Sequence, residues 1–184
     1  IADSAYKGFE PIVFCCFGEC VSEIGDDSFF RCFHIKKAVF PCLKKVGKES
    51  FFACDQTVSF YAPQCQQVGE NAFTFTTNLK RFVAQPKVLQ RGVFKFSGLT
   101  YLDLPSVTKV ENEAFFRSQI RGLKLENCKE FEEDALTNCF SPESTQKEVR
   151  VGCQNLALQL HQLLKISYYV QQASQLKMNK KIKT

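Results

Sequence analysis

A short phrase recurs in this chain at a nearly fixed interval. Residues 24–32 read IGDDSFFRC and residues 46–54 read VGKESFFAC, so equivalent positions lie 22 residues apart. Weaker copies continue the series at spacings of 21 to 23 residues, and up to seven units fill residues 1 to about 140. A period this short, kept over this many copies, predicts a solenoid whose units pack against their neighbours. The copies open with Ile1, Ile24, Val46, Val68, Leu89, Val110 and Phe131.

A second apolar group follows each opening residue after ten or eleven positions. In the first full copy it comprises Ile35, Ala38 and Phe40, followed by Pro41. This is the L-x-x-L-x-L cadence typical of leucine-rich repeats. Its last three positions alternate between the inside and the outside of a coil, which predicts a short strand in every unit. Proline after the strand ends the pairing, because it has no N–H to donate.

Two positions of the repeated phrase have distinct predicted roles. Glycine follows the opening residue at Gly25, Gly47 and Gly69, where we expect a turn with positive φ. A phenylalanine four residues later is predicted to fill the inside of the coil and to stack on its equivalents. Core packing is favoured here over a ligand-binding aromatic cluster. The predicted ladder comprises Phe29, Phe51, Phe73, Phe94 and Phe115.

The unit resembles that of the BspA-like leucine-rich repeat family, which reads roughly I-G-x-x-A-F-x-x-C-x-x-L-x-x-I-x-L-P. Residues 24–41 match it almost position for position, and the resemblance covers about three quarters of the chain. It implies an α/β repeat fold: a curved, right-handed solenoid with a parallel sheet on its concave side. The convex side would carry short helical turns or a second, minor strand. Such arrays occur in surface-exposed and secreted proteins of bacteria and protists, so the resemblance favours a cell-surface or secreted location over the cytoplasm.

The sequence divides after residue 139. Residues 1–139 form the predicted leucine-rich-repeat solenoid, with about six to seven repeats of 21–23 residues. Residues 140–184 begin with a polar loop, continue through a candidate last strand near residue 150 and end in a predicted helix with a basic tail. We expect this helix to cap the last core layer of the solenoid. A segment that extends away to bind a partner is the alternative.

Charge is concentrated at the C-terminus. Residues 146–184 hold seven Lys and Arg against one Glu, a net charge of +6, whereas the whole chain carries +5, so residues 1–145 carry −1. A solenoid that binds nucleic acid needs basic charge along its groove, so nucleic acid is not an expected partner. The tail could contact an acidic surface weakly, although a solvated terminus is the commoner reason for such a run. No apolar run of 18 residues occurs, so we expect no transmembrane segment.

Ten cysteines allow three interpretations. Thr76 and Ser118 replace cysteine at one repeat position, which favours small buried thiols over obligatory pairs. Disulfides between stacked coils remain an alternative, because their Cα separation would permit them. Metal binding is not expected, since no C-x-x-C pair occurs and the two histidines are far from any cysteine cluster. The two recurring cysteine positions are assigned to Cys32, Cys54 and Cys139, and to Cys42, Cys65 and Cys128.

The sequence contains no motif that indicates catalysis. G-x-S-x-G, H-E-x-x-H, P-loop and G-x-G-x-x-G patterns are all absent. The acidic group at Glu130, Glu132, Glu133 and Asp134 falls on a predicted convex turn, where charge usually only meets solvent. We therefore expect no enzyme activity and no cofactor.

The strand register predicts which side chains leave the concave face. Tyr and Arg are frequent anchors of protein interfaces, so we expect a non-catalytic interaction or adhesion module that binds a protein or glycan partner there. The alternative, to which the sequence gives equal weight, is that these side chains are ordinary strand surface without a binding role. A different function would be an intracellular scaffold or adaptor that uses the basic helical tail. The predicted columns are Lys37, Ser59, Arg81, Tyr101 and Gly122, and beside them Val39, Tyr61, Val83, Asp103 and Lys124.

Overall fold

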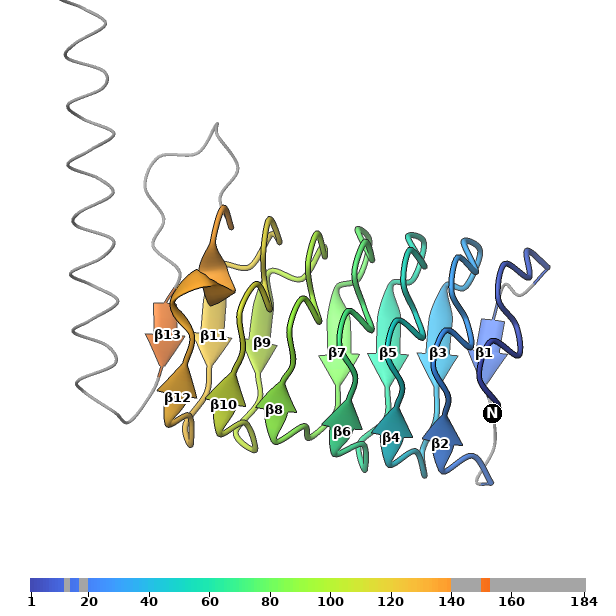
Figure 1. The fold of residues 1–184 in the computed structure, drawn as a ribbon, viewed down its shortest axis with the longest axis horizontal. Coiled ribbons are helices and arrows are strands. Elements are labelled where there is room, and N and C mark those ends of the chain that lie inside the picture. The colour runs from blue at the N-terminus through green and yellow to red at the C-terminus, as the bar shows by residue number, and fades with distance from the viewer. Residues whose placement is uncertain (12–13, 17–19, 140–149, 153–184) are drawn as a thin grey trace, which may run out of the picture.

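The computed structural model describes residues 1–11, 14–16, 20–139 and 150–152. Its coils stack side by side, and each full coil runs through a two-residue strand, a tight turn and a three-residue strand (Figure 1). The long strands are β1 (Phe14–Cys16), β3 (Lys37–Val39), β5 (Ser59–Tyr61), β7 (Arg81–Val83), β9 (Tyr101–Asp103), β11 (Gly122–Lys124) and β13 (Arg150–Gly152). The short strands are β2 (Glu23–Ile24), β4 (Lys45–Val46), β6 (Gln67–Val68), β8 (Val88–Leu89), β10 (Lys109–Val110) and β12 (Glu130–Phe131).

All strand pairs are parallel, and equivalent repeat positions face each other. The long strands pair in the order β1-β3-β5-β7 and, separately, β13-β11-β9. Lys37 is in register with Ser59, and Ser59 with Arg81. This confirms the predicted parallel sheet, and β13 confirms the candidate strand near residue 150.

The other side of the coils carries a second, minor strand. These short strands pair in the orders β2-β4-β6 and β8-β10-β12. The one helical element of the described chain is the 3-10 turn η1 (Glu133–Leu136). Of the two convex structures that the family resemblance left open, the minor strand is therefore the one that recurs.

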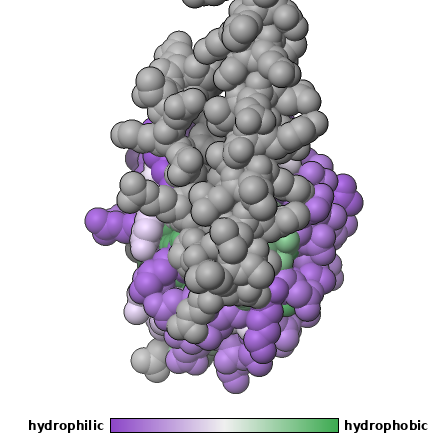
Figure 2. Space-filling model, turned by 90° about the vertical axis from the view of Figure 1, so that its left-hand side faces the viewer, coloured by the Kyte–Doolittle hydropathy of each residue, from purple (hydrophilic) through white to green (hydrophobic). Residues whose placement is uncertain are grey.

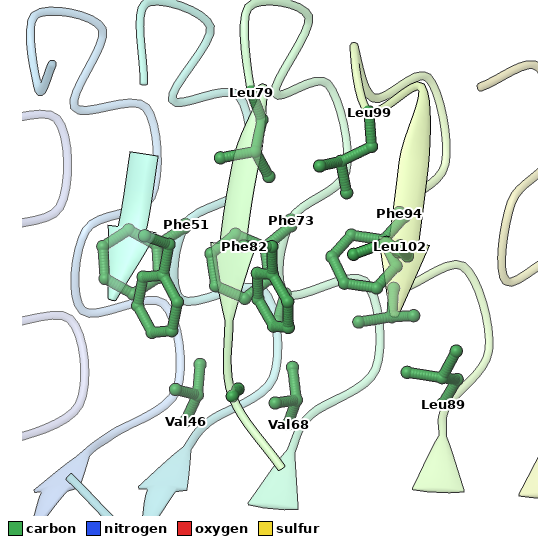
Figure 3. Packing of buried hydrophobic residues seen from close by; sticks show 14 of the residues in the cluster. Val46, Phe51, Val68, Phe73, Leu79, Phe82, Leu89, Phe94, Leu99 and Leu102 are labelled. Carbon is green, nitrogen blue, oxygen red and sulfur yellow. The ribbon is translucent and has the colours of Figure 1, made fainter. Parts of the chain in front are cut away.

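The predicted phenylalanine ladder runs through the interior. Ring centroids of Phe29 and Phe51 are 5.0 Å apart, those of Phe51 and Phe73 5.2 Å, and those of Phe73 and Phe94 5.9 Å. Phe115 continues the stack 5.6 Å beyond Phe94. All five rings are fully buried, and Figure 3 shows three of them among aliphatic side chains from both strand types. The interpretation of these rings as core is confirmed.

The predicted role of the glycines is wrong. Gly25, Gly47 and Gly69 do not have positive φ. A Cβ on Gly47 would lie 2.5 Å from the carbonyl carbon of Gly25, and one on Gly69 would lie 2.5 Å from that of Gly47. Glycine is required because adjacent coils approach too closely for any side chain. Positive φ occurs two residues later, at Asp27, Glu49, Asn71, Gly92 and Glu113.

These left-handed residues allow each turn to bond to the next coil. The N–H groups of Asp27, Phe29 and Arg31 donate to carbonyl oxygens of the following turn at 2.8–2.9 Å. Alternate N–H groups of the turn therefore point along the solenoid. Each turn pays a backbone cost for the left-handed positions, and the bonds between coils offset it.

The cysteines follow the small-residue interpretation in most places. None of the described cysteines Cys20, Cys32, Cys42, Cys54, Cys65, Cys128 and Cys139 forms a disulfide. The Cys54 thiol donates to the Phe29 carbonyl oxygen of the preceding coil at 3.1 Å, and Cys139 does the same to Phe115 at 2.8 Å. Burial raises the pKa of Cys65 and of Cys139 to about 11, so both thiols stay protonated.

The second cysteine position was assigned incorrectly. Cys65 and Cys128 donate their N–H to the last inward residue of the strand segment, as do Leu43 and Val107. Cys42 lies one residue earlier and is only partly buried. This position therefore accepts Leu, Val or Cys, which is the behaviour of an ordinary core site.

Both sheets are interrupted at the same place along the stack. No pairing joins β7 to β9 or β6 to β8 in the described chain, and Figure 1 shows a wider interval there. Leu89 follows Leu79 by ten residues, whereas Val68 follows Thr57 by eleven, so this coil is one residue short after its long strand. Pro86 lies in that shortened turn and has no N–H to donate. The mismatch in length explains why the next strand does not come into register.

The predicted cap helix and basic tail fall on residues 140–149 and 153–184, outside the described residues. The division after residue 139 therefore stays a prediction, although β13 adds a strand to the sheet beyond that point. Viewed from the end that carries β12 and β13, the visible described surface is mainly hydrophilic, with some hydrophobic residues (green) in view (Figure 2). In the described part of the chain, no helix has the length and apolar character needed to cross a bilayer.

Candidate functional site

The residues predicted to form the binding face all lie on long strands. We call the exposed side of β3, β5, β7, β9 and β11 the long-strand face; it corresponds to the predicted concave face. Along each strand the central residue is buried and its neighbours are exposed or partly exposed. The predicted residues lie on this face at Lys37, Val39, Ser59, Tyr61, Arg81, Val83, Tyr101, Asp103, Gly122 and Lys124.

The structure brings these residues together in two groups. Val39, Tyr61 and Val83 are in register across β3, β5 and β7. Across β9 and β11, Asp103 is in register with Lys124. The interruption between β7 and β9 separates the two groups. The sequence predicted continuous columns, whereas the structure has a first group of three coils and a second group of two.

Aromatic and aliphatic side chains are prominent on the long-strand face. Tyr61 is 45% exposed, Val83 42% and Tyr101 57%. A Cβ on Gly122 would lie 2.9 Å from Cδ2 of Tyr101. The Tyr101 ring therefore lies over the glycine of the next strand, and one of its faces remains available to a partner.

On β11, the charge of Lys124 is already paired with neighbouring carboxylates. The Lys124 ammonium group lies 3.0 Å from a Glu126 carboxylate oxygen and 3.5 Å from one of Asp103. The hydrogen bond to Glu126, followed by the charge of Asp103, raises the pKa of Lys124. Lys124 and Asp103 are thus partners of each other.

Sequence reasoning missed a further exposed column on the same side. Lys36, Val58, Lys80, Thr100 and Arg121 each precede a long strand by one residue, and all are exposed. The L-x-x-L-x-L cadence has two adjacent variable positions, and both face outward. Only the second was considered, because strict alternation along the strand was assumed to begin there.

Sequence reasoning also missed an outer aromatic column on the turns. Phe30 stacks on Phe52 at 4.9 Å, and Phe75 on Phe96 at 4.6 Å. Lys95 lies 4.7 Å from the centroid of the Phe116 ring. These rings stack on one another and lie beside cations, although Phe75 remains 39% exposed.

Nothing in the described residues indicates a metal centre, since no group of three potential ligand side chains is present there. The acidic group singled out in the sequence lies on β12 and on or beside η1. Of its members, Glu130, Glu133 and Asp134 are exposed, as expected of solvated charge.

The comparison with protein families decides the family. The family described as BspA type leucine-rich repeat region matches in six copies, over residues 1–97 and 22–143. The chain belongs to this family. BspA-type repeats are generally non-catalytic interaction or surface modules.

One solved structure supports the fold of this BspA-type chain, and a second is structurally similar to a lesser degree. A leucine-rich repeat protein from Eubacterium ventriosum is 14% identical, with a TM-score of 0.54 over 66% of this chain and 32% of its own. A leucine rich cell surface protein from Faecalibacterium prausnitzii is 18% identical, with a TM-score of 0.46 over 74% of this chain and 44% of its own. The chain therefore spans less than half the length of either protein. No curated protein matches it.

Proposed function

We propose that this BspA-type repeat chain is a non-catalytic interaction or adhesion module that binds a protein or glycan partner on its long-strand face. The observation that carries the proposal is the exposure of Tyr61 and Tyr101 on the long-strand face, one on each side of the interruption, with Arg81 on the strand between them. Tyrosine and arginine supply a large share of binding energy at protein interfaces. Stacked repeats hold such side chains at fixed spacing, so little conformational entropy is lost on binding.

The test is a combined replacement on this face. Tyr61→Ala, Arg81→Ala and Tyr101→Ala together should abolish binding to the partner recovered by affinity capture, because they remove the anchors and leave the core intact. A matched control replaces Phe33, Phe75 and Arg117 on the turns, where the two phenylalanines are 38% and 39% exposed. Retained affinity in the folded first variant would place the site elsewhere.

A cell-surface or secreted location is part of the proposal. The alternative is an intracellular scaffold that uses the basic C-terminal tail, which lies outside the described residues. Alkylation followed by mass spectrometry of the natural protein separates the two. Disulfides among the ten cysteines would favour an oxidising compartment, and ten free thiols would favour the cytosol.

A further inference from the structure

Five basic side chains follow one margin of the long-strand face. They occupy the two outward positions at the start of the long strands, and all five are exposed. No acidic residue occurs at these two positions in any of the five coils from β3 to β11. We call this set the basic rim; it consists of Lys36, Lys37, Lys80, Arg81 and Arg121.

The basic rim has no ion-pair partner within the described residues. Lys80 donates to the carbonyl oxygen of Gly98 at 3.1 Å, and no member of the rim lies within 4.0 Å of a carboxylate oxygen. Several other cations of the solenoid are paired, as Lys95 is with Glu113 at 3.1 Å and Lys7 with Asp27 at 3.0 Å. Like charges gathered without counter-charges repel one another, and an anionic partner would relieve that repulsion.

Apolar side chains separate the cations along the rim. Val58, which is 43% exposed, lies on the coil between Lys36 and Lys80, and Tyr101 lies on the coil between those of Arg81 and Arg121. The cations thus recur on every second coil. Between the coils of Lys36 and Lys80, two strand spacings correspond to about 10 Å, which is about one three-residue turn of a polyproline II peptide. The interruption between β7 and β9 makes the interval to Arg121 longer (Figure 1).

We propose that the basic rim docks an acidic segment of a partner protein, with acidic residues about three positions apart and apolar residues between them. The inference rests on the proposed function, since it assumes that the long-strand face is the binding surface. Exposed valine offers little to a sulfated glycan or a nucleic acid, whereas it complements an aliphatic or aromatic side chain. Alternation of cation and apolar surface therefore favours a peptide over a uniformly charged polymer.

A second basic strip supplies the control. Lys44, Lys87 and Lys129 are exposed and precede short strands, at the position equivalent to the rim on the minor sheet. These three lysines also form no ion pair within the described residues, but acidic residues lie beside them on the minor strands. Glu23 is in register with Lys45, and Glu130 lies 3.7 Å from Lys109. Neutralising either strip changes the net charge equally, so the two variants separate a specific site from general attraction.

The experiment measures binding of a fluorescein-labelled peptide with about three Glu-Val-Tyr repeats by anisotropy, at low and moderate salt. Lys36→Gln, Lys80→Gln and Arg121→Gln together should weaken binding about tenfold, because three exposed charge contacts are lost. Lys44→Gln, Lys87→Gln and Lys129→Gln together should change it less than about twofold. Replacing Glu by Gln in the peptide should also remove binding.

Three results would overturn the inference. The first is an equal loss of affinity in the rim variant and in the control variant, and the second is no binding of the peptide at all. The third is a loss of heparin or oligothymidylate affinity in the rim variant that exceeds its loss of peptide affinity. The rim variant leaves Tyr61, Arg81 and Tyr101 in place. A captured partner lost only from the Tyr61, Arg81 and Tyr101 variant would therefore sink this inference alone, and a partner kept by that variant would sink the proposed site.

Discussion

At the scale of single residues, one turn of this solenoid makes two opposite backbone demands. Gly47 must lack a side chain, because the preceding coil occupies the space where its Cβ would be. Ala53 has a φ of 56°, a left-handed conformation that is unfavourable for any residue with a Cβ.

Substitutions at these two positions should have opposite effects on stability. Gly47→Ala places a Cβ 2.5 Å from backbone atoms that cannot move aside, and should destabilise the fold by about 1–3 kcal/mol. Ala53→Gly relieves the left-handed strain and should stabilise it by about 0.5–1 kcal/mol after the entropy cost of glycine. Urea titration of both variants checks this. An unchanged midpoint for Gly47→Ala would mean that the coils are not so closely packed.

At the same scale, the sequence predicted the inside of each coil better than its backbone. The ring at Phe73 could be assigned to the core because both the period and the strand cadence place it there. The glycines were misread because the sequence alone does not distinguish a residue that needs positive φ from one that needs space. Only the position of the neighbouring coil separates these two reasons.

At the scale of secondary-structure elements, the interruption between β7 and β9 is the main departure from a regular stack. The interval of ten residues from Leu79 to Leu89, against eleven from Thr57 to Val68, is visible in the sequence. The loss of strand pairing could not be predicted from it, because one missing residue can be absorbed in a turn or can break the register of a strand. Here the shortened turn still bonds to the preceding coil through the N–H groups of Gln85 and Lys87, but Pro86 between them has none to donate, and both sheets separate.

Amide exchange should reveal this interruption. The Ala62 N–H donates to the Val83 carbonyl oxygen at 2.8 Å, whereas no backbone hydrogen bond joins Ala84, the equivalent residue, to β9. Ala84 is also 8% exposed and Ala62 fully buried. We expect the Ala84 amide to exchange at least about tenfold faster than that of Ala62 in native-state hydrogen exchange. Equal protection would indicate a continuous sheet.

At the scale of the whole molecule, the chain has a narrow core and a long surface. The repeats predicted the family, the parallel sheet and the columns of the long-strand face. They did not predict the basic rim, because its cations come from two repeat positions and only their exposure without carboxylate partners makes them a set. A nearly neutral body can still carry a locally basic margin, which overall charge does not reveal.

The central claim is that the side chains that point into each coil form the packed core, whereas those that point outward on the long-strand face are free to contact a partner. A denaturant titration of Phe73→Ala and Tyr61→Ala tests it most directly. Phe73 is fully buried between Phe51 and Phe94, so its truncation should cost about 3–5 kcal/mol. Tyr61 is 45% exposed, and its truncation should cost less than about 1 kcal/mol. A greater loss for Tyr61→Ala than for Phe73→Ala would reverse the two sides and contradict the account.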